Sequence, residues 1–192
     1  MCDNDVGIYL LQDIIINNQI FTVFYDDGCS DLVVRKDAVD RLGSYATKIF
    51  DGPLNISGIG VASTSSNHGI YAINIPLADG QIASMSGICL DKLTQTFPMY
   101  PLDEAVSSIH KAFNGDASLL PKLPKSIGGN IDIMIGIKYL RYHPNIIFKM
   151  ATGLSIYESV FNGTDGNRGV IGEPHRLFGE VRLRNGINPQ SS

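Results

Sequence analysis

Residues 24–30 read Phe24-Tyr25-Asp26-Asp27-Gly28-Cys29-Ser30, so a run of apolar residues leads directly into two acids and a glycine. A second apolar run begins at Leu32. A strand end holds the Asp26 carboxylate at a fixed place, and Gly28 lets the chain turn sharply because it lacks a Cβ. Two interpretations remain open here. One is an ordinary acidic turn, since Asp and Gly are common turn residues, and the other is a site at which Asp26 does chemistry.

Short β-prone runs separated by turns lie on both sides of this segment. We expect hairpins over residues 6–25, 69–90 and 146–160, with turns at 17–18, 78–81 and 151–153. A short buried strand is expected at 131–135. Helices are expected at 35–42, ended by Gly43, and at 101–113, where apolar residues recur at helical spacing, with a helical turn at 139–142. The sequence therefore predicts a mainly β chain with two or three short helices.

Composition excludes several classes of function. The chain has 192 residues, with 15 Lys and Arg against 19 Asp and Glu and a formal net charge of -4, so it lacks the basic stripe of a nucleic-acid binder. No apolar run approaches the roughly 20 residues that a membrane span needs. Three cysteines form no closed disulfide framework, which favours a reducing, intracellular and cytoplasmic setting. The four histidines stand far apart without ligand spacing, so we expect no metal and no cofactor.

The order of three features resembles the retropepsin-like aspartic proteases. These are the strand ending in Asp26-Asp27-Gly28, the glycine-rich stretch 56–71, and the strand 131–136 that ends in Ile135-Gly136 before a short helix. The amino-acid sequence of the central region is similar to that of the protease region of Bel/Pao-type retrotransposon polyproteins. The resemblance covers roughly residues 6–161 and includes the segments 69–71, 75–77, 86–91, 97–101, 135–140, 153–154 and 156–159.

This resemblance implies a fold and a set of site residues. The fold would be a retropepsin-like closed β-barrel, one half of an acid protease, with a flap hairpin that closes over the substrate. The implied roles are the catalytic acid Asp26, the active-site loop residues Asp27, Gly28 and Cys29, the substrate-binding flap residues Gly58, Ile59, Gly60 and Val61, and the structural pair Ile135 and Gly136 behind the loop.

The resemblance also implies a mechanism that needs two carboxylates. Aspartic proteases place two such groups about 3 Å apart, where they share one proton and activate a water. The other Asp-Gly pairs of this chain, at 51–52, 79–80 and 165–166, do not stand between two hydrophobic strands. We therefore expect a homodimer with one Asp26 from each copy, which cleaves extended peptide segments of a retroelement polyprotein.

One position departs from the family pattern. The residue after the catalytic Asp is usually Thr or Ser, whose hydroxyl braces the two loops across the dimer, and here it is Asp27. A second acid beside the dyad adds repulsion, so activity would be restricted to acidic pH, weak or absent. A catalytically inactive retropepsin-fold module for dimerisation or peptide binding is the alternative. Cys29 is expected to be a small packing residue, and Asp132 is expected to have a surface or structural role.

Two other classes fit the sequence poorly. A calcium loop at 26–31 or 162–167 lacks the D-x-D-x-D-G spacing, and a nucleophilic hydrolase would need a G-x-S-x-G elbow that the chain does not have. The turn-rich break after Phe161 predicts a protease domain over residues 1–161. Residues 162–192 would then be a tail or the start of the next polyprotein segment.

Overall fold

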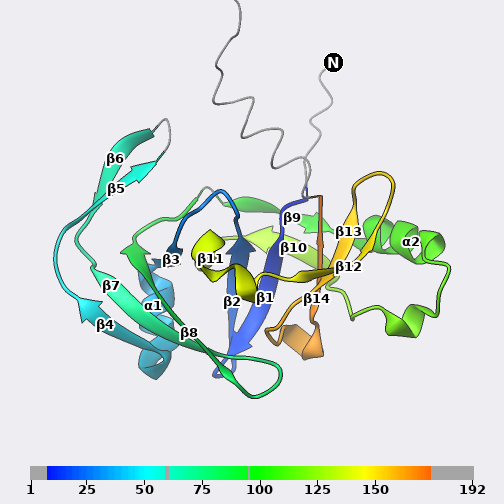
Figure 1. Ribbon diagram of the computed structural model, residues 1–192, viewed down its shortest axis with the longest axis horizontal. Coiled ribbons are helices and arrows are strands. Elements are labelled where there is room, and N and C mark those ends of the chain that lie inside the picture. Colours follow the sequence, from blue (N-terminus) through cyan, green and yellow to red (C-terminus); the bar gives the residue numbers. More distant parts are fainter. Residues whose placement is uncertain (1–7, 59–60, 95, 174–192) are drawn as a thin grey trace, which may run out of the picture.

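The fold is organised around one seven-stranded sheet with strand order β1-β2-β11-β3-β8-β7-β4 (Figure 1). The computed structural model describes residues 8–58, 61–94 and 96–173. The strands of this sheet are β1 (Leu11–Ile16), β2 (Gln19–Tyr25), β3 (Leu32–Arg35), β4 (Ala46–Phe50), β7 (Ile70–Pro76), β8 (Ile82–Leu90) and β11 (Ile133–Ile135). The predicted mainly β class is confirmed.

Three smaller sheets and a few short helices complete the described chain. The smaller sheets pair β5 (Leu54–Gly58) with β6 (Val61–Ser66), β9 (Phe97–Pro101) with β10 (Ser126–Gly129), and β12 (Asn145–Lys149) with β13 (Ser155–Glu158) and β14 (Gly169–Gly172). The α-helices are α1 (Lys36–Leu42) and α2 (Asp103–Ala112), and the 3-10 helices are η1 (Gly43–Tyr45), η2 (Ala117–Leu119), η3 (Ile137–Tyr142) and η4 (Thr164–Gly166). Within the described ranges, no helix has the length and apolar character that crossing a bilayer requires.

The turn between β1 and β2 follows from its two asparagines. Asn17 and Asn18 both adopt positive φ, at 49° and 59°. A two-residue hairpin loop needs this conformation at both positions, and asparagine tolerates it better than other residues with a side chain. The turn fixes the register of the hairpin, with Ile16 opposite Gln19 and Leu11 opposite Phe24.

Strand β11 occupies the centre of the sheet although it comes late in the chain. It runs parallel to β2, with Ile135 opposite Tyr25, and antiparallel to β3, with Ile135 also opposite Leu32. All three of its residues are buried. A strand buried on both faces reads as a continuous apolar run, which is what Ile133-Met134-Ile135 provides.

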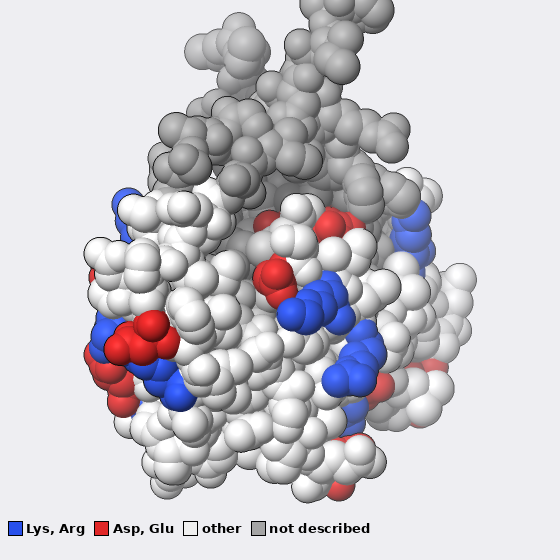
Figure 2. Space-filling model, turned by 60° about the vertical axis from the view of Figure 1, so that its left-hand side comes forward, with Lys and Arg blue, Asp and Glu red and all other residues white. Residues whose placement is uncertain are grey.

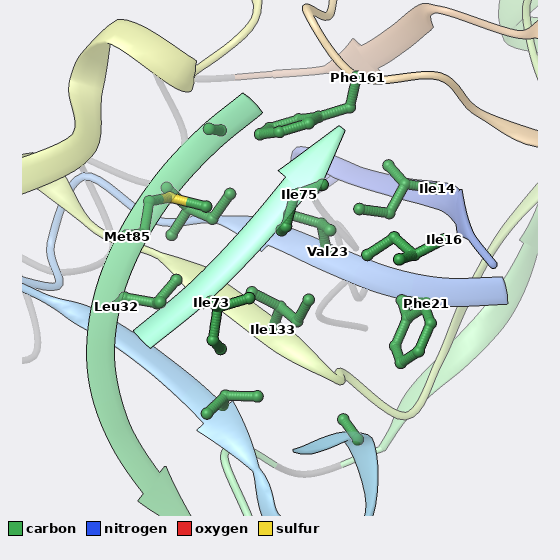
Figure 3. Packing of buried hydrophobic residues seen from close by; sticks show 14 of the residues in the cluster. Ile14, Ile16, Phe21, Val23, Leu32, Ile73, Ile75, Met85, Ile133 and Phe161 are labelled. Atoms are coloured by element: carbon green, nitrogen blue, oxygen red, sulfur yellow. The ribbon is translucent and has the colours of Figure 1, made fainter. Parts of the chain in front are cut away.

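The sheet separates two hydrophobic clusters. Side chains of β7 and β8 face those of β1, β2 and β11 across the larger cluster (Figure 3), which contains Ile14, Phe21, Val23, Leu32, Ile73, Ile75, Met85, Ile133 and Phe161. Side chains that point to the other face of the sheet, such as Phe24 and Met134, belong to the second cluster. This cluster also contains Leu102, which precedes α2, Ile109 of α2, Ile156 of β13 and Ile171 of β14. The alternation of side chains along β2 and β11 thus serves both clusters.

The expected closed barrel is not formed by hydrogen-bonded strands among the described residues. The seven-stranded sheet has β1 and β4 as separate edges. The outer edge of β1 is instead met by a later part of the chain, because Ile15 N donates to Asn162 O at 3.1 Å and Ile14 forms an isolated bridge with Gly163.

The boundary expected after Phe161 falls inside the ordered body. Strand β14 pairs with β13 along its whole length, from Gly169 opposite Glu158 to Gly172 opposite Ser155. Val170 and Ile171 are fully buried. Residues 162–173 are therefore part of the packed structure, and the remainder of the predicted tail lies outside the described residues.

A cluster of ion pairs around the buried Asp132 connects α1 to the start of β11. The Asp132 side chain is 7% exposed, and its Oδ1 lies 2.6 Å from the Arg35 guanidinium and 2.6 Å from that of Arg41. Its other oxygen accepts from Thr22 N at 2.9 Å. The structural role expected for Asp132 agrees with these contacts, and the residue links β2, β3 and α1 at the start of β11.

We predict that Asp132→Asn destabilises the fold by about 2 to 3 kcal/mol, because it leaves two guanidinium groups without their shared counter-charge. The matched control is Asp37→Asn, which removes a 59%-exposed carboxylate from the same Arg35 and should cost less than about 0.5 kcal/mol. Urea unfolding at neutral pH measures both. Equal losses in the two variants would contradict the role given to burial.

Candidate active site

Asp26 follows the last residue of β2 and is held by its main chain on both sides. Its amide N donates to Ile135 O of β11 at 3.1 Å, and its own carbonyl accepts from Cys29 N at 3.3 Å. The Asp26 side chain turns back onto the loop, where Oδ1 accepts from Gly28 N at 2.9 Å. The residue is half-buried, so its carboxyl group is fixed by contacts and still reaches the surface.

Gly28 is needed for space rather than for an unusual backbone. It is absent from the glycines with positive φ in the described chain. A Cβ at this position would lie 3.1 Å from Asp26 Oδ1, closer than side-chain atoms normally approach. Any larger residue would therefore push on the Asp26 carboxylate itself.

The residues that follow β11 are hydrogen-bonded to the loop that bears Asp26. Three consecutive amides donate to it: Gly136 N to Asp31 O at 3.0 Å, Ile137 N to Cys29 O at 2.8 Å and Lys138 N to Ser30 O at 3.1 Å. A Cβ on Gly136 would lie 2.3 Å from Asp31 O and 2.5 Å from Cys29 O. Only glycine permits this approach, and the contact accounts for the Ile-Gly sequence at 135–136.

Burial raises the pKa of the Asp26 carboxyl group above its ordinary value. The hydrogen bond from Gly28 N works in the opposite direction, because it favours the charged form. The negative charge of Asp27 raises the pKa further, and His143 lowers it. The result is a carboxyl group that holds its proton more tightly than a surface aspartate.

The two other predicted loop residues differ in exposure. Asp27 is exposed, while Cys29 is half-buried and its Sγ donates to Asp31 O at 3.3 Å. Burial raises the pKa of the Cys29 thiol, and the charges of Asp26 and Asp31 add to this effect. Since the thiolate is the nucleophilic form, Cys29 is poorly suited to nucleophilic catalysis.

The predicted flap corresponds to a hairpin that projects from the main sheet (Figure 1). Gly58 ends β5 and is paired with Val61 at the start of β6, while Ile59 and Gly60 lie outside the described residues. The hairpin is shorter than expected, because Tyr71 belongs to β7 and pairs with Gly87. Gly69, with a φ of 79° and no room for a Cβ against Phe50 O, makes the break between the hairpin and β7.

The other Asp-Gly pairs lie in surface turns. Asp79-Gly80 forms the turn from β7 to β8, and Asp165-Gly166 lies in η4. The interpretation of Asp51-Gly52 and Asp79-Gly80 needs correction, because both pairs do stand between two strands, the first between β4 and β5 and the second between β7 and β8. However, β4 is an exposed edge strand, and the Asp51 carboxylate pairs with Lys48 at the surface at 3.0 Å. Asp51, Asp79 and Asp165 are all exposed, whereas Asp26 is half-buried.

His143 is a site residue that the sequence did not reveal. It follows η3, eight positions after Ile135, and its Nε2 lies 2.9 Å from Ile135 O. Its ring also packs edge-on against Tyr25, with centroids 5.5 Å apart. A lone histidine before Pro144 carries no pattern that points to Asp26, so only the folded chain shows the relation. No set of three His, Cys, Asp or Glu in the described chain could hold a metal ion.

Comparison with known proteins gives one structural likeness. No protein-family model matches the sequence, and no curated protein matches it. The chain is similar to the solved structure of the retroviral protease-like domain of Ddi1 from Leishmania major, with a TM-score of 0.36 and 13% sequence identity. The match covers 86% of this chain and 96% of that chain. A likeness at this level does not establish an activity, which has to follow from the contacts around Asp26.

We predict that Asp26→Asn makes the protein more stable at pH 7 but not at pH 3. Because the folded-state pKa of Asp26 is raised, the unfolded chain loses this proton first, from about pH 3.9 upward, and folding is penalised above that range. At pH 3 the carboxyl is protonated in both states, so the penalty is absent. The difference in urea midpoint between variant and wild type at the two pH values measures it.

The matched control for this prediction is Asp79→Asn. The Asp79 carboxylate accepts the amide of Gln81 two residues on, as Asp26 accepts that of Gly28, but Asp79 is exposed. A gain of the same size in Asp79→Asn would show that burial at Asp26 is not the cause.

Proposed function

We propose that this protein is a retropepsin-like aspartic endopeptidase that acts as a homodimer. The observation that carries the proposal is the Asp26 carboxyl group, half-buried at the end of β2 and fixed by Gly28 N, with a raised pKa. The backbone of β11 and Gly136 clamps the loop that bears it. These are the properties of a group that exchanges protons at a fixed position rather than of a surface turn.

A second copy is needed because peptide hydrolysis by this route uses two carboxyl groups. Among the described residues, no second Asp-Gly segment offers a comparable carboxyl. In the proposed homodimer the two Asp26 side chains meet across a two-fold axis, in an isologous contact. Like charges so close cannot both ionise, so the pair holds one proton and titrates as a unit.

The chemistry then follows from that shared proton. The ionised Asp26 accepts a proton from a water while the water oxygen attacks the peptide carbonyl carbon, and the protonated Asp26 donates its proton to the carbonyl oxygen. In the second step the Asp26 that took the proton of the water passes it to the amide nitrogen, and the C–N bond breaks. The carbonyl double bond re-forms as one hydroxyl of the tetrahedral intermediate gives its proton to the other Asp26. No cofactor enters either step.

The substrate in this proposal is an extended polypeptide. The projecting hairpin β5–β6 supports it, since an extended peptide can bind beneath such a hairpin by strand addition. The sequence resemblance to Bel/Pao-type elements suggests segments of a retroelement polyprotein as the natural substrate, in the cytoplasm. The proposal includes no nucleic-acid partner. On the face that Figure 2 shows, basic and acidic side chains are interspersed and form no basic stripe.

The second candidate is a catalytically inactive module of the same fold that dimerises or binds peptides. Asp27 favours it, because this exposed acid stands where the resembling family carries a hydroxyl that braces the dimer. Two copies would bring four carboxyl groups towards one axis, and their repulsion opposes both dimerisation and the ionisation of the pair.

The direct test of the protease proposal is Asp26→Asn. Cleavage of an unstructured peptide library, followed by mass spectrometry at pH 4 to 7, should fall at least about 100-fold, because the general acid-base step is removed. A pepstatin-type inhibitor should block the wild type, and sedimentation should show a dimer for both proteins. Asp79→Asn is the control that should retain activity. Cleavage that survives Asp26→Asn would contradict the proposal, and a wild-type dimer without cleavage would favour the inactive module.

Asp27→Thr tests the departure at the neighbouring position. Since Asp27 raises the pKa of Asp26, its removal should move the pH profile of cleavage towards lower pH. The new hydroxyl should also tighten the dimer. Cleavage rates across pH and dilution experiments by sedimentation measure the two effects, with Asp27→Asn as the variant that removes the charge without adding a hydroxyl. An unchanged profile in both variants would contradict the coupling of Asp27 to Asp26.

A further inference from the structure

His143 makes a contact whose direction is fixed by chemistry. Its Nε2 lies 2.9 Å from Ile135 O and 3.3 Å from Gly136 O. Both partners are carbonyl oxygens, which accept hydrogen bonds and cannot donate them. Nε2 therefore carries a hydrogen, whether the ring is neutral or charged, and the imidazole acts as a donor to the end of β11.

The acceptor of this hydrogen bond is also the acceptor for Asp26. Ile135 O receives Asp26 N at 3.1 Å and His143 Nε2 at 2.9 Å. A carbonyl oxygen has two lone pairs, so both contacts can be satisfied at once. The position of this one oxygen thus depends on His143, and the main chain of Asp26 depends on the position of this oxygen.

We propose that His143 is a positioning residue for Asp26, which holds the Ile135 carbonyl through Nε2 and thereby fixes the main chain that carries the catalytic carboxyl group. This inference rests on the proposed function. It adds a residue outside the Asp-x-Gly loop to the machinery. Because the imidazole can carry a positive charge, His143 also acts on the ionisation of Asp26.

The surroundings of the ring keep it in place. His143 packs edge-on against Tyr25, whose hydroxyl donates to Gln12 Oε1 at 2.6 Å and lies 3.2 Å from Ser159 Oγ. Tyr25 is fully buried, and burial raises its pKa so that it stays uncharged. A rigid aromatic neighbour on one side and the Ile135 carbonyl on another leave the imidazole little freedom.

Tyr25, which is neutral, packs against the His143 ring, and the charge of His143 acts on the Asp26 carboxyl group. Asp27 acts on the same carboxyl group from the loop. The charge of His143 lowers the pKa of Asp26, while that of Asp27 raises it. Removal of the imidazole should consequently let the pKa of Asp26 rise, and removal of the Nε2 hydrogen bond should loosen its position.

Two variants separate these effects. His143→Gln keeps a side-chain N–H donor without the charge, and His143→Phe keeps a ring against Tyr25 without the donor. Titration of the Asp26 carboxyl carbon by NMR should show a higher midpoint in both variants. In the cleavage assay kcat should fall about tenfold in His143→Phe with KM little changed, whereas His143→Gln should retain kcat within about twofold. His110→Gln, at an exposed position on α2, is the control for both measurements.

The NMR titration decides this inference even if the protein cleaves nothing. Absence of cleavage by the wild type would count against the proposed function, while a raised Asp26 midpoint in the two His143 variants would still support the coupling. If His143→Phe folds and leaves both the Asp26 titration and kcat at wild-type values, the inference is overturned. Should His143→Phe fail to fold, His143→Leu, which also lacks the donor, replaces it in both measurements, and wild-type values of the Asp26 titration and kcat in that variant overturn the inference equally.

Discussion

The insertion of β11 between β2 and β3 is the constraint on which the rest of the structure depends. The three residues of β11 pair with two strands at once, in parallel with β2 and antiparallel with β3. The next residue, Gly136, approaches Asp31 O so closely that no side chain is possible. The Asp26 loop is thus not a free turn between β2 and β3. It is wrapped around a strand end that arrives more than a hundred residues later.

Two aspartates at opposite ends of this insertion show how neighbours decide a role. At the start of β11, Asp132 shares its charge with Arg35 and Arg41 and contributes to stability. Beyond the other end, Asp26 is partly removed from water, and its carboxylate accepts the amide hydrogen bond of Gly28. A carboxyl group in that situation costs stability at neutral pH, and such a cost is typical of a site kept for chemistry.

Local signals predicted much of the fold. The asparagine pair at 17–18 gave the first turn, and the apolar run at 133–135 gave a buried strand, because each depends on the conformational preferences of its own residues. Contacts across long separations were beyond local patterns. The sequence near Asp132 does not indicate that two arginines more than ninety positions earlier form ion pairs with it. The contact that covers the outer edge of β1 likewise depends on where Asn162 and Gly163 return.

The site was predicted in part for the same reason. The loop residues and Gly136 came from the resemblance, whose motifs are contiguous in sequence. His143 has no motif, and its role follows from the short helix η3, which turns the chain back so that the ring reaches the carbonyl of Ile135. A side chain that acts through a backbone oxygen leaves no residue-type signature at its target, since every residue offers the same carbonyl.

The two charged neighbours of Asp26 also bear on how a dimer with Asp27 could work. In the proposed homodimer, each copy would bring one Asp27 and one His143 along with its Asp26. The acidic neighbours favour retention of protons by the pair, and the histidines favour its ionisation. Both tendencies are needed, because the dyad must hold one proton and release the other. In the proposed dyad the effect of His143 on the pKa of Asp26 is thus opposite to that of the extra acid, Asp27.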